Sequence, residues 1–126
     1  MYQVMIVDDE PMAASLIVNI IKRKYSNFDI MGTAYDGEEA LELMEKKGEP
    51  DVLITDIQMP VMNGLKLVEE TKKRYPEVLS VIVSGYQEFE YAKQAIAFGV
   101  CDYILKPIVP SEFAKLIVKI EEKLRQ

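Results

Sequence analysis

Five short apolar runs, separated by longer segments with helical spacing, constrain the fold of this chain more than any other feature. Most of the runs are continuously apolar rather than alternating, which is typical of parallel strands that are covered on both faces. We therefore predict a parallel sheet in which each strand is followed by a helix. The predicted strands are Val4–Val7, Phe28–Ala34, Asp51–Thr55, Leu79–Ser84 and Asp102–Leu105.

The segments between these runs show the three- and four-residue spacing of buried helix faces. Asp36 is predicted to cap the second helix, because Glu39 follows three residues later. The third helix is predicted from about Gly64 to Tyr75, and Pro110 suits the first turn of the last helix. The predicted apolar faces contain Met12, Leu16 and Ile20 in the first helix, Phe89, Ala92 and Ile96 in the fourth, and Phe113, Leu116, Ile117, Ile120 and Leu124 in the last.

Five such strand–helix units, joined by right-handed crossovers, form a doubly wound α/β sandwich with a five-stranded parallel sheet between two helix layers. The chain has 126 residues, of which 49% are hydrophobic, and this suffices for a core. No linker, repeat or low-complexity stretch divides the sequence, so we predict a single domain over residues 1–126. In such a fold, ligands bind beyond the carboxyl ends of the strands, where the strand order reverses.

The net charge of -6 and the absence of histidine exclude several functional classes. A nucleic-acid-binding domain needs a basic face, so we predict no direct contact with nucleic acid. Without histidine, the chain has no serine–histidine or cysteine–histidine nucleophile, and a metal would bind mainly through oxygen. The single cysteine, Cys101, excludes an internal disulfide, and no apolar run reaches the roughly 18 residues of a membrane span. We predict a cytoplasmic protein without a membrane segment.

Charged and hydroxyl side chains lie where the predicted strands end. Asp8 and Asp9 follow the first strand, Asp56 the third and Lys106 the fifth, and Ser84 ends the fourth. Clustered carboxylates repel each other unless a cation lies between them, and oxygen ligands suit Mg²⁺, with Mn²⁺ as an alternative. Lys106 and Ser84 supply the charge and the hydrogen bond that a bound phosphoryl group needs. We therefore predict Mg²⁺-dependent phosphoryl transfer to Asp56 as the nucleophile.

Four segments of the chain match one known family in order and spacing: IVDDEP, ITDIQMPVMNG, IVSGY and DYILKP. The chain resembles, over its whole length, the receiver domain of bacterial two-component response regulators, which has the flavodoxin-like fold also called CheY-like. The resemblance implies that Asp56 accepts a phosphoryl group from a sensor histidine kinase. It also implies that the backbone carbonyl of Gln58 completes a metal site with Asp8, Asp9 and Asp56.

The same resemblance implies how a phosphoryl group is bound and sensed. Ser84 and Lys106 would bind the phosphate, and Ser84 and Tyr103 would form a conformational switch. Pro107 follows a lysine–proline bond that is usually cis in the family, which would turn Lys106 into the site. The chain would then be a signalling domain that catalyses only its own phosphorylation and dephosphorylation, and not an enzyme.

The output is predicted from a longer segment, SGYQEFEYAKQAIAFGVCDYILKPI, which is most similar to receivers fused to an AraC-type DNA-binding domain. This implies transcriptional control through an effector outside these residues, and we predict an excised receiver. A stand-alone receiver that acts by protein–protein contact is the alternative. The fourth and fifth helices carry charges of both signs, so we predict a weak, phosphorylation-dependent homodimer. These charges belong to Glu88, Glu90 and Lys93 on one helix and to Lys115, Lys119 and Glu122 on the other.

Two other classes share part of this pattern. A metal-dependent phosphohydrolase would use the same nucleophile but normally has an acid–base aspartate two residues later, where this chain has Gln58. A flavodoxin-like cofactor module needs a Gly-, Ser- or Thr-rich loop after the first strand, whereas DDEPMAAS is acidic and would repel a phosphate. Taken singly, Asp8 and Asp9 are as consistent with capping a helix, Tyr103 with core packing, and Asn63-Gly64 with a plain turn.

Overall fold

The computed structural model describes residues 1–85, 90, 94, 96–97 and 99–126. Its five strands form one parallel sheet with the order β2-β1-β3-β4-β5, which confirms the predicted doubly wound α/β fold. The elements are β1 (Tyr2–Val7), α1 (Pro11–Lys24), β2 (Phe28–Ala34), α2 (Gly37–Lys47), β3 (Val52–Asp56), α3 (Gly64–Arg74), β4 (Leu79–Ser84), β5 (Asp102–Leu105) and α5 (Pro110–Leu124).

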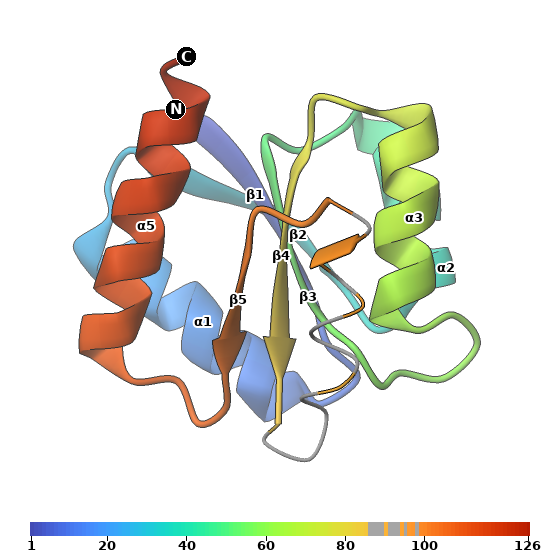
Figure 1. Ribbon diagram of the computed structural model, residues 1–126, viewed down its shortest axis with the longest axis horizontal. Coiled ribbons are helices and arrows are strands. Elements are labelled where there is room, and N and C mark those ends of the chain that lie inside the picture. Colours follow the sequence, from blue (N-terminus) through green and yellow to red (C-terminus); the bar gives the residue numbers. More distant parts are fainter. Residues whose placement is uncertain (86–89, 91–93, 95, 98) are drawn as a thin grey trace.

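Helices cover both faces of the sheet, with α1 and α5 on one side and α2 and α3 on the other (Figure 1). Along β1, Val4 and Ile6 pack into the core beneath α1 and α5, whereas Met5 and Val7 pack into the core beneath α2 and α3. Both sets of side chains are buried, which explains why this strand is continuously apolar. The result is a three-layer structure whose central strands are shielded from water.

The buried face of α1 differs from the predicted one. Met12 and Leu16 are exposed and Ile20 is only partly buried. Apolar residues occupy most positions around this helix, so four-residue spacing alone selected the wrong stripe. The helix packs against the sheet through residues spaced three and four apart, which are Ala14, Ile17 and Ile21.

Helix caps fix the ends of the elements that surround the sheet's carboxyl edge. Asp36 Oδ1 accepts a hydrogen bond from the backbone N–H of Glu39 at 2.9 Å, which confirms the predicted cap of α2. Asn63, predicted as part of a plain turn, instead caps α3 by accepting a hydrogen bond from the N–H of Lys66 at 2.9 Å. Pro110 occupies the first turn of α5 as predicted.

Most of the predicted fourth helix lies outside the described residues. Its predicted residues Glu88, Phe89, Ala92 and Lys93 are all outside them. The described positions in this segment that are helical are Glu90, Gln94, Ile96 and Ala97. Ile96, predicted to face the core, is 57% exposed, and its carbonyl accepts the N–H of Gly99, where the chain turns at a positive φ. Among the helices that the structure describes, none is both long and apolar enough to cross a membrane.

Candidate functional site

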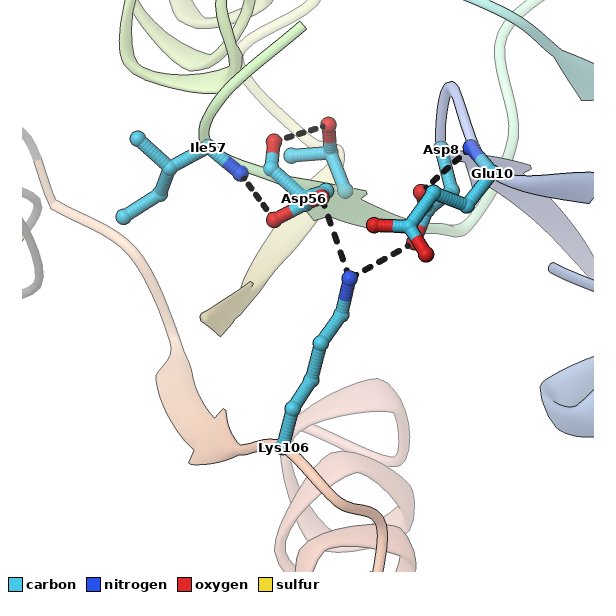
Figure 2. A network of polar contacts seen from close by, with 6 residues as sticks. Asp8, Glu10, Asp56, Ile57 and Lys106 are labelled. Atoms are coloured by element: carbon cyan, nitrogen blue, oxygen red, sulfur yellow. Dashed lines mark hydrogen bonds and ion pairs between the residues drawn. The ribbon is translucent and has the colours of Figure 1, made fainter. Parts of the chain in front are cut away.

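Three charged side chains meet at the carboxyl edge of the sheet. Asp8 follows β1 and Asp56 ends the adjacent strand β3, and both are almost fully buried, with exposed fractions of 4% and 5%. Lys106 follows β5 and extends between them, as Figure 2 shows. Its Nζ atom lies 3.1 Å from Asp56 Oδ2 and 3.2 Å from Asp8 Oδ2. The sequence-predicted cation and two of the predicted carboxylates are therefore in direct contact.

The backbone orients each of these carboxylates. Asp56 Oδ1 accepts the N–H of Ile57 at 2.8 Å, and Asp8 Oδ1 accepts the N–H of Glu10 at 2.9 Å. In each carboxylate, Oδ1 thus accepts a hydrogen bond from a nearby backbone N–H group, while Oδ2 contacts Lys106 (Figure 2). The hydroxyl of Thr55 donates to the carbonyl oxygen of Asp56 at 2.9 Å, which fixes the end of the strand itself.

Burial and the charge of Lys106 shift the pKa of Asp56 in opposite directions. Removal from water and the nearby Asp8 carboxylate raise the pKa of Asp56 from 3.8 to about 6, and the hydrogen bond and charge of Lys106 only partly offset this rise. Burial alone would lower the pKa of Lys106, but contact with Asp56 and Asp8 outweighs it and raises that pKa. The site therefore combines a carboxylate that ionises reluctantly with an ammonium that keeps its proton.

Carboxylates gather closely enough here to share a divalent cation. Asp8, Asp9, Glu10 and Asp56 each offer an oxygen atom, and these atoms all lie within 4.8 Å of one another. Such a set of hard oxygen donors fits Mg²⁺ or Mn²⁺. Glu10 was missed by the sequence reasoning, although it directly follows the acidic pair. Gln58, whose carbonyl was predicted to complete the site, lies exposed in the loop after β3.

Ser84 ends β4 next to this cluster and is fully buried. Asp56 pairs with Val83 in the sheet, so Ser84 lies one residue further along the neighbouring strand. Its hydroxyl has no hydrogen-bond partner in the part of the chain that the structure describes. A buried hydroxyl without a partner is costly, and an incoming oxygen acceptor would relieve that cost.

Tyr103 lies outside this polar network. It is partly buried and packs against the apolar cluster that contains Ile57 and Ile82. This cluster includes Ile57, the residue that directly follows Asp56. The peptide bond between Lys106 and Pro107 is cis.

Comparisons with known proteins agree with this geometry. The family model of the response regulator receiver domain matches residues 4–118. The transcriptional regulatory protein YesN of Bacillus subtilis is 34% identical over 126 residues, which are 100% of this chain and 34% of YesN. The transcriptional regulatory protein HptR of Staphylococcus aureus is 35% identical over 98% of this chain and 48% of its own length. The chain thus spans a third to a half of the length of these relatives.

Solved structures show the same likeness. The receiver (REC) domain of AraT, a response regulator from Geobacillus stearothermophilus, superimposes with a TM-score of 0.91 at 38% identity, covering 99% of this chain and 96% of that one. A DNA-binding response regulator of the LuxR family from Staphylococcus aureus gives a TM-score of 0.84 at 29% identity, covering 95% and 98% of the two chains.

Proposed function

The chain belongs to the receiver domain family of two-component response regulators, and we propose that Asp56 accepts a phosphoryl group from a sensor histidine kinase. The reaction depends on Mg²⁺, for which Mn²⁺ can substitute. The domain is a signalling module that acts on itself and not an enzyme with turnover of an external substrate.

The observation that carries the proposal is the contact of one buried carboxylate, Asp56, with the Lys106 ammonium at 3.1 Å inside a cluster of carboxylates. A purely structural ion pair would not need Asp8, Asp9 and Glu10 around it, because their charges repel that of Asp56. A divalent cation bound by this cluster would lower the repulsion and offset the charge of a transferring phosphoryl group. Asp8, Asp9, Asp56 and the Gln58 carbonyl are the proposed ligands.

In the proposed reaction, one Asp56 oxygen attacks the phosphorus, and the bond between phosphorus and the donor nitrogen breaks. The electron pair of that bond stays on the nitrogen. Lys106 contributes a fixed positive charge, and the Ser84 hydroxyl donates the hydrogen bond that it does not make in the described structure. The chain supplies position and electrostatics rather than an acid–base group.

The first experiment is an intact-mass measurement after incubation with acetyl phosphate and Mg²⁺. We expect one added phosphoryl group in the wild type and none in Asp56→Asn. Asp29→Asn, which removes an exposed carboxylate on β2, is the matched control and should gain the same mass as the wild type. An undiminished mass gain in Asp56→Asn would disprove the assignment of the acceptor.

We also propose that the output is control of transcription by a DNA-binding domain of a longer protein that includes this receiver. The support is that YesN and HptR are named as transcriptional regulatory proteins and are longer than this chain. An AraC-type effector stays a prediction, and a stand-alone receiver that acts by protein contact is the alternative. Sequencing the gene beyond the codon for Gln126 distinguishes a receiver joined to a DNA-binding domain from a stand-alone receiver.

Phosphorylation is expected to shift a conformational equilibrium through Ser84 and Tyr103. When the Ser84 hydroxyl turns toward the phosphoryl group, space opens beside β4, and Tyr103 can move inward from its partly buried position. A typical coupling of this kind is worth about 1 to 3 kcal/mol. We expect a beryllium fluoride mimic to promote a weak homodimer in sedimentation, and Ser84→Ala and Tyr103→Ala to reduce the effect.

The surface charges limit how strong this dimer can be. Lys119 already pairs with Asp102 of its own chain at 3.0 Å, and Lys115 with Glu112 at 3.6 Å. Exposed pairs contribute only about 0 to 1 kcal/mol each, so the dimer should weaken with added salt. The mimic could bind without changing either the dimerisation of the chain or the spectra of the residues around Tyr103. In that case the switch through Ser84 and Tyr103 is not the output mechanism.

A further inference from the structure

The loop between β3 and α3, residues 57–63, is fixed at both ends by N–H groups of glycines. The carbonyl of Ile57 accepts the N–H of Gly64 at 2.7 Å, and the carbonyl of Met62 accepts the N–H of Gly37 at 3.1 Å. Gly64 begins α3, but Gly37 begins α2, which is a separate element on the same face of the sheet (Figure 1). The loop that carries Gln58 is therefore attached to a helix that contributes no side chain to the acid cluster.

Neither glycine is needed for an unusual backbone angle. Among the glycines, positive φ values occur at Gly48 and Gly99, and not at Gly37 or Gly64. What both positions require is close approach. A Cβ atom at Gly64 would overlap the carbonyl oxygen of Asp56, and a Cβ at Gly37 would lie 2.7 Å from Met62 Cγ and 2.9 Å from the Met62 carbonyl oxygen.

The middle of the loop is strained and depends on these attachments. The N–H of Met62 donates to the carbonyl of Pro60 at 2.7 Å, which closes a three-residue turn around Val61. Val61 has a φ of 65°, although it is β-branched, and this backbone conformation is unfavourable for such a residue. Strained turns persist only where the surrounding structure holds them. Displacing Met62 would let the turn relax and would move the backbone that leads back to Gln58.

We propose that Gly37 is a positioning residue for the metal site: by allowing α2 to contact Met62, it holds the loop so that the Gln58 carbonyl faces the acid cluster. The proposal rests on the proposed function, because it takes that carbonyl as a metal ligand. Gly37 itself touches neither the metal nor the phosphoryl group.

The test compares Mn²⁺ binding to the wild type and to Gly37→Ala by water-proton relaxation, with phosphoryl uptake from acetyl phosphate followed against Mg²⁺ concentration. We expect the Mn²⁺ concentration at half-saturation to rise about tenfold, as for residues that orient metal ligands indirectly. The Mg²⁺ concentration for half-maximal uptake should rise by the same factor, while the rate at saturating Mg²⁺ stays within about twofold, because Asp56 and Lys106 are untouched. Thermal stability is expected to fall as well, because the added Cβ would lie 2.9 Å from the Met62 carbonyl oxygen and the helix preference of alanine over glycine offsets this only in part.

Gly32→Ala is the matched control. The atoms nearest to its Cβ would all belong to the flexible side chain of Leu43, at 2.8 Å and beyond, and not to the loop. We expect wild-type Mn²⁺ binding in this variant. If Gly37→Ala does not fold, Gly37→Ala/Met62→Ala replaces it, with Met62→Ala alone as its reference, since truncation removes the nearest contact, with Met62 Cγ, and leaves those with the Cβ and the carbonyl oxygen of residue 62, each at 2.9 Å.

The outcomes separate this inference from the proposed function. A wild type that takes up no phosphoryl group, or binds no Mn²⁺, refutes the proposed function. A wild type that does both, with a folded Gly37 variant whose Mn²⁺ midpoint stays within twofold, overturns the positioning role alone. An equal shift in Gly32→Ala also overturns it, because general packing would then be the cause.

Discussion

In Lys106→Met, phosphoryl transfer from acetyl phosphate to Asp56 is expected to slow by about 10²- to 10³-fold at saturating Mg²⁺, the range seen when one preoriented electrostatic donor is removed. Lys106 contacts both Asp56 and Asp8, at 3.1 and 3.2 Å, so its charge is already in place before the reaction begins. Methionine keeps most of the aliphatic side chain but removes that charge. Single-turnover mass spectrometry measures the rate.

Metal affinity separates this effect from loss of the metal site. Removing a cation from among carboxylates makes the cluster more negative, so Mn²⁺ should bind to Lys106→Met at least as tightly as to the wild type. Lys119→Met is the control, because Lys119 is also a lysine paired with an aspartate, Asp102, at 3.0 Å but lies on the exposed side of α5. A rate for Lys106→Met within threefold of the wild type, or equal slowing in Lys119→Met, would count against the assigned role.

In the metal-free protein, the ionised Asp56 carboxylate is expected to destabilise the folded state. Asp56 has a pKa of about 6 in the folded state against 3.8 without the fold, so folding favours its protonated form. Above pH 6 the ionised carboxylate lowers the free energy of unfolding, and this penalty disappears as the pH falls from 6 to below 4. Asp56→Asn removes the penalty and should raise the free energy of unfolding at pH 7.5 by about 1 to 2 kcal/mol, after allowance for screening by water at the open side of the site.

Urea unfolding at several pH values, with a chelator present, measures this difference. The gain of Asp56→Asn over the wild type should shrink toward zero near pH 4, where the wild-type carboxylate is protonated. Asp29→Asn should stay within about 0.5 kcal/mol of the wild type at pH 7.5, as is usual for exposed sites. Added Mg²⁺ should reduce the difference in free energy of unfolding between Asp56→Asn and the wild type, because it stabilises only the wild type. A destabilised Asp56→Asn at pH 7.5 would contradict the prediction.

The sheet and its functional edge could be predicted because their signals are local. Continuous apolar runs identify parallel strands, and polar residues directly after those runs must lie at one edge. Even here the third strand is displaced by one residue: Asp51, predicted as its first residue, lies before it and accepts the N–H of Gln3 at 2.7 Å. At its other end the strand reaches Asp56 instead of stopping at Thr55, because Asp56 still pairs with Val83 of β4.

The remaining features depend on contacts between distant segments. The buried face of α1 could not be chosen from spacing, because apolar residues surround that helix and only its packing on the sheet selects Ile17 over Leu16. The close approach of Gly37 to Met62 joins the start of α2 to the loop before α3, and no local pattern relates the two. Likewise, Val61 gives no sign in the sequence of its positive φ, since a β-branched residue would ordinarily argue against one.

The reach of Lys106 across the sheet also affects how the chain acquires its chemistry during synthesis. Its ammonium contacts residues 98 and 50 positions earlier, and it follows the edge strand that is made last. A nascent chain that ends before β5 has both acidic partners but lacks the cation that prepares them. We therefore expect a chain that ends before β5 to take up phosphoryl groups from acetyl phosphate much more slowly than the complete domain, as predicted for Lys106→Met.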